Sequence, residues 1–179
     1  MTTSSELLEI YYNQNQMSNY FTDKMGILSI LSYSSNMPIY NGVISSYNAL
    51  VKAIADVPTS GGIIFFPSTK NGGTYLIDSN VTIPSNVTLW FANGAKLYRA
   101  NSAIITLNCV IEAGLYQIFD DDGTGSWSGS PLTKEAYPEW YGVIKGNSSY
   151  ESTNKTAFEK LLSAGYKDIK FSKGTYYIN

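Results

Sequence analysis

The chain has 179 residues, a formal net charge of −2 and charged side chains at only 15% of its positions. This balance gives no basic face for nucleic acid and no polybasic run for anionic lipid, while a hydrophobic content of 44% is enough for a packed core. Histidine is absent, which excludes Ser-His-Asp, Cys-His and histidine-based zinc sites built from this chain alone.

The N-terminal stretch "MTTSSELLEIYY" lacks the basic start and apolar core of a secretory signal, and no apolar run approaches the roughly 20 residues that span a bilayer. We therefore expect a soluble protein made in a cytoplasm, with no membrane insertion. Fifteen Tyr and 15 Gly, with many Asn, Ser and Thr, are typical of short strands that expose hydroxyls and amides between glycine-rich turns.

Residues 1–35 carry apolar side chains three and four positions apart, which predicts two helices separated at Gly26. The stripe packs either onto the main domain or onto copies of itself and a larger assembly. Under the second interpretation, the expected assembly contacts are Leu7, Ile10, Tyr20, Phe21, Leu28 and Leu31.

The stretch "SYNALVKAIADVP" predicts a short amphipathic helix that ends at Pro58. Its apolar face consists of Ala49, Leu50, Ala53, Ile54 and Val57. The following "TSGGIIFFP" predicts a turn and a buried strand.

Short apolar runs separated by Ser-Asn, Asn-Gly and Ala-Gly turns predict further strands, and their regular interruption favours a coil that wraps round an axis. These runs are Val81 and Ile83, Val87 to Phe91, Ala95 and Leu97, Ile104 to Leu107, Val110 and Ile111, and Tyr116 and Ile118. Cys109, the single cysteine, lies among them and is predicted to be a small buried hydrophobe rather than a reactive thiol.

A pattern of helix, strand, turn, G-T-Y and strand occurs twice. The two helical stretches align in sequence at a constant displacement. The aligned positions are Ala49, Leu50, Lys52, Ala53 and Ile54 with Ala157, Phe158, Lys160, Leu161 and Leu162. In the strand stretches, Ile64 and Phe66 align in sequence with Ile169 and Phe171, and residues 73–78 align with residues 174–179. An amphipathic helix laid across the end of stacked parallel coils covers apolar surface and unpaired backbone groups, so two copies predict two starts of a stacked β structure.

The stretches "ADVPTSGGIIFFPSTKNGGTYLI" and "VTIPSNVTLWFANGAKL" resemble the opening of the pectate-lyase or pectin-lyase superfamily. The stretch "AYPEWYGVIKGNSSYESTNKTAFEKLL" resembles the Pro-Glu-Trp-Phe-Gly-Ala entry into the β-helix of bacteriophage tailspikes and related polysaccharide-processing proteins. The resemblance implies a mainly β fold with N-terminal helices: a right-handed parallel β-helix with helical caps, in a trimer.

The chain departs from the family where an Asp-rich segment is usual. It has Lys145, Gly146, Asn147, Ser152, Thr153, Asn154 and Thr156 there, so charge is lost although Ser or Asn can still cap the helix. No position matches the family's catalytic acids, which lie on later coils or between subunits. We therefore assign no catalytic, cofactor-binding or metal-binding residue and expect no cofactor.

Two acidic features have alternative interpretations. Asp120, Asp121 and Asp122 in "FDDDGTGSWSGS" would suit Ca²⁺ or an acid/base pair, but the ligand spacing of an EF-hand is missing, so a solvated turn is predicted. Glu139, between Pro and Trp, is expected to orient a loop through backbone hydrogen bonds rather than to catalyse a reaction.

The aromatic residues and the sequons also have alternative interpretations. Trp90, Trp127, Trp140 and Tyr141 either stack on sugar rings or pack inside the coils and between subunits, and packing is predicted. The N-x-(S/T) sequons begin at Asn80, Asn86, Asn147 and Asn154, and these asparagines are predicted to be turn residues.

The compact stretch "EAYPEWYGV" stands between the two predicted β units and is interpreted as their junction. Pro138, Glu139, Trp140 and Tyr141 form it, with Pro138 stiffening the entry and both aromatics packing the units together. The predicted organisation is a helical virion-attachment segment at 1–42, a small capped β-helix at 43–120, a junction at 121–145, and the cap and first coil of a second β-helix at 146–179.

The leading hypothesis is the virion-anchoring N-terminal part of a phage tailspike or tail fibre. It implies a homotrimer in the phage tail that contacts tail or baseplate proteins through its N-terminus. Bacterial surface polysaccharide would be recognised by a C-terminal part beyond residue 179. The alternatives are a polysaccharide lyase or glycosidase of the pectin-lyase superfamily, and a non-enzymatic structural tail adaptor.

Overall fold

The computed structural model describes residues 26–33, 41–68 and 73–179. Its elements are β1 (Ile27–Ser29), η1 (Ile30–Tyr33), β2 (Asn41–Ser45), α2 (Tyr47–Asp56), β3 (Gly62–Phe66), β4 (Thr74–Ile77), β5 (Val81–Ile83), β6 (Val87–Phe91), β7 (Lys96–Arg99), β8 (Ile104–Leu107), β9 (Val110–Glu112), β10 (Phe119–Asp121), β11 (Ser126–Gly129), η2 (Pro138–Tyr141), η3 (Ser148–Tyr150) and α3 (Glu151–Ser163). The described chain is thus mainly β, with α2 and α3 as its two α-helices. No helix in these ranges is both long and apolar enough to cross a membrane.

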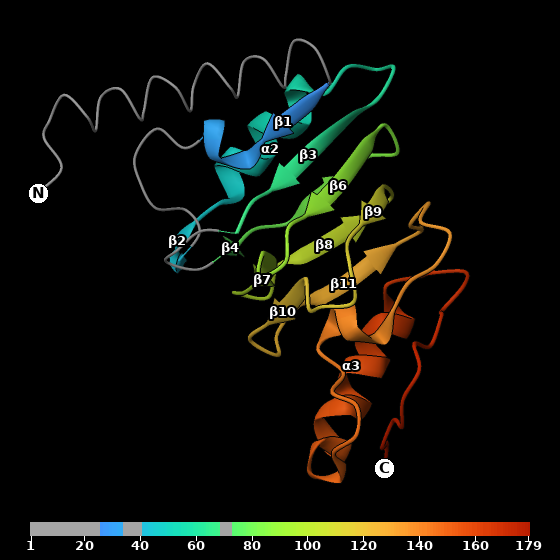
Figure 1. Ribbon diagram of the computed structural model, residues 1–179. Helices are drawn as coiled ribbons and strands as arrows, with labels where there is room; N and C mark the ends of the chain where they lie inside the picture. The colour runs from blue at the N-terminus through green and yellow to red at the C-terminus, as the bar shows by residue number, and fades with distance from the viewer. Residues whose placement is uncertain (1–25, 34–40, 69–72) are drawn as a thin grey trace, which may run out of the picture.

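The strands form three parallel sheets that the chain visits in a fixed rotation. Their orders are β1-β3-β6-β9, β10-β7-β4-β2 and β11-β8-β5. The chain therefore takes one strand from each sheet in β3 to β5, again in β6 to β8, and again in β9 to β11 (Figure 1). We call this body of strands the stack.

Every strand pairing in the stack is parallel, and most keep one register. Residues that meet across neighbouring turns of the chain are 22 positions apart in pairs such as Thr106 with Ser128. A constant register keeps the same face of each strand pointing inward, because side chains alternate along a strand. One inward row consists of Ile64, Leu89 and Ile111, all buried.

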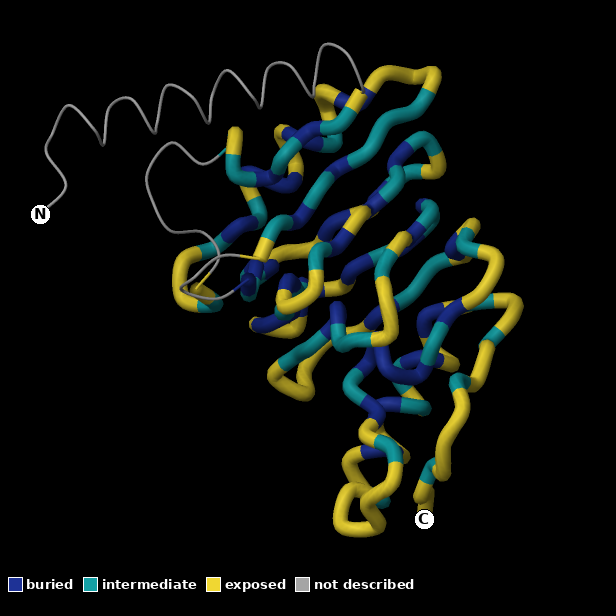
Figure 2. Tube along the Cα trace, in the orientation of Figure 1, coloured by how far each residue is buried: buried dark blue, intermediate teal, exposed yellow. Residues whose placement is uncertain are grey.

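Aromatic rings tie successive turns of the chain together. The ring of Phe66 stacks on that of Phe91, with centroids 4.7 Å apart, and Phe91 meets Phe119 edge-on at 5.8 Å. Both geometries are favourable for aromatic pairs. The buried residues form one hydrophobic cluster from Leu28 to Ala164, and Figure 2 shows buried segments alternating with more exposed ones along the strands.

The helices α2 and α3 lie at opposite ends of the stack (Figure 1). The first matches the predicted helix and buries Ala49, Leu50 and Ala53. It ends before Pro58 because proline lacks the N–H that a continuing helix needs. The second buries Ala157 and Leu161, two positions that the internal repeat had aligned with the first helix.

The predicted second N-terminal helix is wrong where the structure describes it. Gly26 has φ +64°, which ends any helix there, and Leu28 lies in β1, paired with Ile64 of β3. Burial of Leu28, with 6% of its surface exposed, and the parallel pairing outweigh the helical spacing of the sequence. Leu31 lies in η1, partly buried, whereas Leu7, Ile10, Tyr20 and Phe21 lie outside the described residues.

Most of the predicted strands are confirmed, but the last prediction fails. The strand expected at Tyr116 and Ile118 instead begins at Phe119, and β11 forms in a segment expected to be a loop. The register of β7 and β8 explains this, because Leu97 pairs with Phe119 and Ile104 with Ser126. The boundary predicted at residue 120 therefore falls inside β10.

We call residues 46–78 the first cap unit and residues 151–179 the second cap unit. In the first, the hydroxyl of Tyr75 donates a hydrogen bond of 2.6 Å to the carbonyl of Pro67. In the second, Tyr176 donates one of 3.1 Å to the carbonyl of Ser172, which is the equivalent position. The tyrosine of the repeated G-T-Y pattern thus closes the same turn twice.

The ring pair beside this hydrogen bond is repeated too. Phe66 and Tyr75 meet edge-on at 5.1 Å and 81°, and Phe171 and Tyr176 at 5.3 Å and 88°. The predicted match between the two units therefore extends to side-chain geometry. In the second unit a single bridge, Ala136 to Ile169, stands where the first unit has strands.

Candidate functional site

The predicted junction forms a buried 3-10 turn, η2, whose four residues are all buried. Pro138 begins it, where the missing N–H costs nothing. Gly142 ends it with φ +91°, a conformation that favours glycine. A Cβ at Gly142 would also lie 2.9 Å from the side-chain amide of Gln117. Any other residue here would therefore be strained both by the positive φ and by this close contact.

Trp140 connects segments on both sides of the turn. Its indole N–H donates to the carbonyl of Gly114 at 2.9 Å, and its own carbonyl accepts from the N–H of Ile118 at 3.0 Å. Its ring lies 5.6 Å from that of Tyr137 and 6.3 Å from that of Tyr166, which follows α3. Trp140 thus holds the loop before β10 against the segment after the second helix.

Tyr141 packs the opposite side of the junction. Its ring lies 5.0 Å from Phe119 and 6.0 Å from Trp127, and its hydroxyl donates to that of Tyr166 at 3.3 Å. Burial raises the pKa of both tyrosines above their ordinary value. Trp127, Trp140 and Tyr141 are therefore packing residues, as predicted.

Glu139 gathers polar groups from the second cap unit. Its Oε1 accepts from Lys145 at 2.9 Å, and Ser172 donates to the same oxygen. The hydroxyl of Tyr176 lies 3.0 Å from this oxygen and 3.1 Å from the carbonyl of Ser172, and its single hydrogen is shared between them. Burial opposes ionisation, but the hydrogen bonds from Ser172 and Lys145 outweigh it, so the pKa of Glu139 lies below its ordinary value. The expectation that Glu139 orients a loop through backbone hydrogen bonds is wrong in its partners, which are mainly side chains from residues 145–176.

Asp121 is the centre of a second buried cluster. It is 1% exposed in its side chain and lies 3.0 Å from the guanidinium of Arg99, itself 3% exposed. Lys160 of α3 reaches Oδ1 at 2.8 Å, and the indole N–H of Trp127 donates at 3.1 Å to Oδ2, the oxygen that Arg99 contacts. The predicted solvated turn is therefore wrong for Asp121, because the strand register places this residue between two strands and a helix.

The environment of Asp121 keeps it ionised. Burial opposes the charge, but hydrogen bonds from Lys160, Trp127 and the N–H of Gly123 outweigh it and lower the pKa below its ordinary value of 3.8. Arg99 also lies over the Trp127 ring, with its central carbon 5.5 Å from the centroid. The carboxylate and the aromatic face both offset the burial of the guanidinium, whereas its buried Nε has no hydrogen-bond partner among the described residues.

The two neighbouring aspartates have ordinary structural roles. Asp120 is about one-third exposed and pairs with Lys96 at 2.6 Å. Asp122 is exposed and accepts hydrogen bonds from Thr124 and from the N–H of Asn101, as expected for a turn. In the described ranges, no group of three or more His, Cys, Asp or Glu side chains could hold a metal ion.

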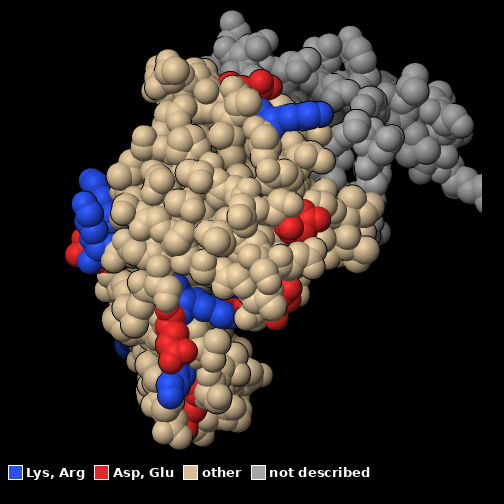
Figure 3. Space-filling view, turned by 180° about the vertical axis from the view of Figure 1, so that it is seen from behind, with Lys and Arg blue, Asp and Glu red and all other residues tan. Residues whose placement is uncertain are grey.

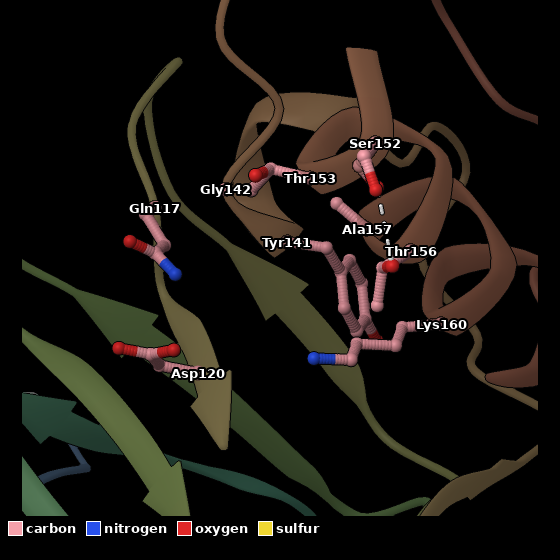
Figure 4. A pocket seen from close by; sticks show the side chains of 9 residues that line it. All are labelled: Gln117, Asp120, Tyr141, Gly142, Ser152, Thr153, Thr156, Ala157 and Lys160. Carbon is pink, nitrogen blue, oxygen red and sulfur yellow. Dashed lines mark hydrogen bonds between the residues drawn. The ribbon is translucent and has the colours of Figure 1, made fainter. Parts of the chain in front are cut away.

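A cleft of about 310 Å³ is bordered by η2, α3 and β10 (Figure 4). Its lining is mainly polar: Gln117, Asp120, Tyr141, Gly142, Ser152, Thr153, Thr156, Ala157 and Lys160. Small-molecule sites are usually lined by apolar groups with a few polar ones. The two charged groups in the lining are already paired, with Lys96 and Asp121.

The remaining asparagine predictions hold in part. Asn80 accepts from the N–H of Ile104, Asn86 donates to the carbonyl of Pro58, and Asn147 caps η3 by accepting from the N–H of Ser149. Asn154 is instead fully buried in α3, so its prediction as a turn residue is wrong. Its side chain accepts from the N–H of Ile144 and donates to the carbonyls of Ile144 and Tyr177, which seats the helix against both segments.

Cys109 is buried and unpaired, as predicted. Burial raises the pKa of its thiol to about 12, so almost none is present as the reactive thiolate near neutral pH. Trp90 differs from the other aromatic residues predicted to pack, Trp127, Trp140 and Tyr141, because 41% of its surface is exposed on the outer face of the stack.

Arg99 and Lys160 were not singled out as site residues. The signal for Arg99 was available, because it is the only arginine in the chain and lies two residues after inward-facing Leu97. A second missed signal is the pair "PIYNGVI" and "PEWYGVI", which repeats Pro38, Gly42, Val43 and Ile44 as Pro138, Gly142, Val143 and Ile144. Gly42 and Gly142 both have positive φ, and Pro38 lies outside the described residues.

No family model, curated protein or solved structure matches this chain. The resemblance to the pectin-lyase superfamily therefore stays a prediction, and the site is interpreted from its own geometry.

We expect Asp121→Asn to lower the free energy of unfolding near neutral pH by about 3 to 5 kcal/mol, because it leaves Arg99 buried without its counter-charge. The folded-state pKa of Asp121 is depressed, so its stabilisation is complete above its ordinary value and is lost as the pH falls through the folded-state pKa. The difference from wild type should therefore narrow below about pH 4. Urea unfolding across this range measures it.

The control is Asp120→Asn on the same strand. Its partly exposed ion pair should contribute no more than about 1 kcal/mol. Equal losses for the two variants near neutral pH would contradict the role given to Asp121.

We expect Trp140→Ala to loosen the second cap unit before the stack, because neighbouring units of a stacked protein open separately. Hydrogen exchange measured by mass spectrometry should speed up in residues 144–179, with β3 and β6 unchanged. Trp140→Phe keeps a ring in place and should have the smaller effect. An equal rise in exchange throughout the chain would show that the junction belongs to one indivisible core.

Proposed function

We propose that this chain is a right-handed parallel β-helix that serves as the virion-anchoring part of a phage tailspike or tail fibre. Three observations support the coil architecture: every strand pairing is parallel, the chain rotates through three sheets, and the register recurs at 22 positions. Helices at both ends of the stack are consistent with capped coils.

The observation that carries the proposal is the attachment of the second cap unit to the stack. Asp121 connects strand and helix, Glu139 connects the junction to residues 145–176, and Trp140 packs between them. The junction thus attaches α3 and the single bridge of the second cap unit to the stack through buried contacts. A buried attachment of this kind suits a fibre protein whose consecutive units keep a fixed orientation. Residues 1–42 would contact tail or baseplate proteins, and the protein would be located in the virion.

Surface chemistry supports self-association into a homotrimer. Trp90 is 41% exposed and its ring lies 4.7 Å from Phe65 on the outer face of β3 and β6. Val43 in β2 is 78% exposed. Charged side chains of both signs are sparse and intermingled on the face shown in Figure 3, and most of its area is uncharged. Uncharged faces with exposed aromatic side chains are typical of protein contacts.

The alternative function is a polysaccharide lyase or glycosidase. A general acid in such an enzyme needs a raised pKa, yet the pKa values of Asp121, Asp122, Glu135 and Glu139 all lie below their ordinary values. These groups are therefore suited to structural ion pairs and turns. The polysaccharide-recognising part is proposed to lie beyond this chain. A non-enzymatic tail adaptor is the third candidate and shares the structural role.

Light scattering coupled to size-exclusion chromatography tests the proposal. We expect a trimer of 19.7 kDa chains that binds isolated tail or baseplate proteins through residues 1–42. Deleting residues 1–25, which keeps β1 paired with β3 and Leu28 in the core, should abolish tail binding while the stack keeps its circular dichroism. A monomer at every concentration, without affinity for tail components, would contradict the proposal. Incubation with capsular polysaccharides should release no new reducing ends or unsaturated uronates, and turnover would favour the enzyme.

A further inference from the structure

The second cap unit has a neighbour on one side only. In the first cap unit, Ile64 pairs with Leu28 on the preceding strand and with Leu89 on the following one. In the second, the equivalent Ile169 pairs with Ala136 on the preceding side. The described residues place no strand on its other side.

The next strand position shows the same asymmetry. Thr74 of the first cap unit pairs with Asn41 before it and with Lys96 after it. The equivalent Thr175 accepts a hydrogen bond of 2.9 Å from the N–H of Gly146, which lies on the preceding side. The second cap unit therefore repeats the first cap unit and its pairing with the preceding segment. The described residues provide no equivalent of β6 and β7, the strands that pair with the first cap unit on its following side.

Exposure of the inward residues follows from this difference. Phe66 is fully buried in the first cap unit because Phe91 of the next turn stacks on it, whereas the equivalent Phe171 is 55% exposed. Ile77 is fully buried, and the equivalent Ile178 is 49% exposed. Figure 2 shows this end of the chain mostly exposed.

These residues are nevertheless already ordered for packing. Phe158 of α3 stacks on Phe171 at 5.6 Å, and Tyr176 meets Phe171 edge-on. The hydrogen bond from Tyr176 to Ser172 fixes the turn between the two strand segments. Helix α3 thus covers one side of the Phe171 ring and leaves the other side open.

We infer that Phe171, Tyr176 and Ile178, with the backbone of residues 167–178, form a docking surface for one further β coil. The occupant has the chemistry of residues 79–99, which form three short strands, and the two equivalent to β6 and β7 would pair with the second cap unit. It carries an inward aromatic at the position of Phe91 and an inward aliphatic at the position of Leu97. The first cap unit shows what such a coil contributes, namely a parallel ladder on both strands and a ring stacked on the phenylalanine. The inference rests on the coil architecture proposed above and is independent of a virion role.

The test grafts a second copy of residues 79–99 directly after Asn179 in the full chain. This coil should pair with residues 167–171 and 175–178, so we expect amide exchange in residues 167–179 to slow by about tenfold or more relative to the ungrafted chain. The matched control carries Leu89→Ser and Phe91→Ser in the grafted copy and should give no slowing. Phe171→Ser in the grafted chain should also remove it.

Equal exchange with the intact and the control graft would overturn the inference. Exchange in the ungrafted chain that slows as protein concentration rises would overturn it too, because a second copy of the chain would then occupy the surface. Unchanged exchange in β3 and β6 verifies that the original stack stays folded in every variant. The oligomeric state is measured separately, so failure of the trimer proposal leaves this result interpretable.

Discussion

The carboxylate of Asp121 links the stack of strands to the second helix, α3. It meets Arg99 of β7, Trp127 of β11 and Lys160 of α3, with hydrogen bonds or ion pairs of 2.8 to 3.1 Å. A buried charge is tolerated only when its partners replace the water it has lost. Because those partners come from two sheets and from the second helix, the compensation exists only when the stack and α3 are assembled together. The same constraint places η2 in a fixed position, since Tyr141 packs against Trp127 and Phe119 beneath the cluster.

The regular register of the stack brings these groups together. A displacement of 22 positions places Asp121 beside Arg99, and displacements of 25 and 28 positions keep Phe66, Phe91 and Phe119 in contact across successive turns of the chain. Glycine and tyrosine residues stabilise individual turns between these elements. Gly142 allows the sharp end of η2, and the repeated tyrosine holds the turn between two strands in each cap unit. The junction and the stack are therefore parts of one packing scheme.

Sequence reasoning predicted the parts that repeat locally. The first helix, most strands, the match of the two cap units and the burial of Cys109 all follow from short-range periodicity or from self-similarity. It failed where a distant neighbour decides. Leu28 becomes a strand residue because β3 offers a parallel partner, and Asp121 becomes buried because Arg99 and Lys160 lie far from it in the chain. The ion pair of Glu139 was equally hidden, because in the sequence Lys145 marked only a departure from the family's acidic segment, whereas in the structure it is the counter-ion of Glu139. The single arginine on an inward position was the one local sign of a buried ion pair.

A double-mutant cycle between Asp121 and Lys160 tests most directly whether the second helix is locked to the stack. The free energy of unfolding would be measured for wild type, Asp121→Asn, Lys160→Met and the double variant. If the carboxylate joins strand and helix as described, the two losses should be coupled by about 1 to 3 kcal/mol. Losses that add to within about 0.5 kcal/mol would show that the contact carries no mutual energy, and would contradict the account.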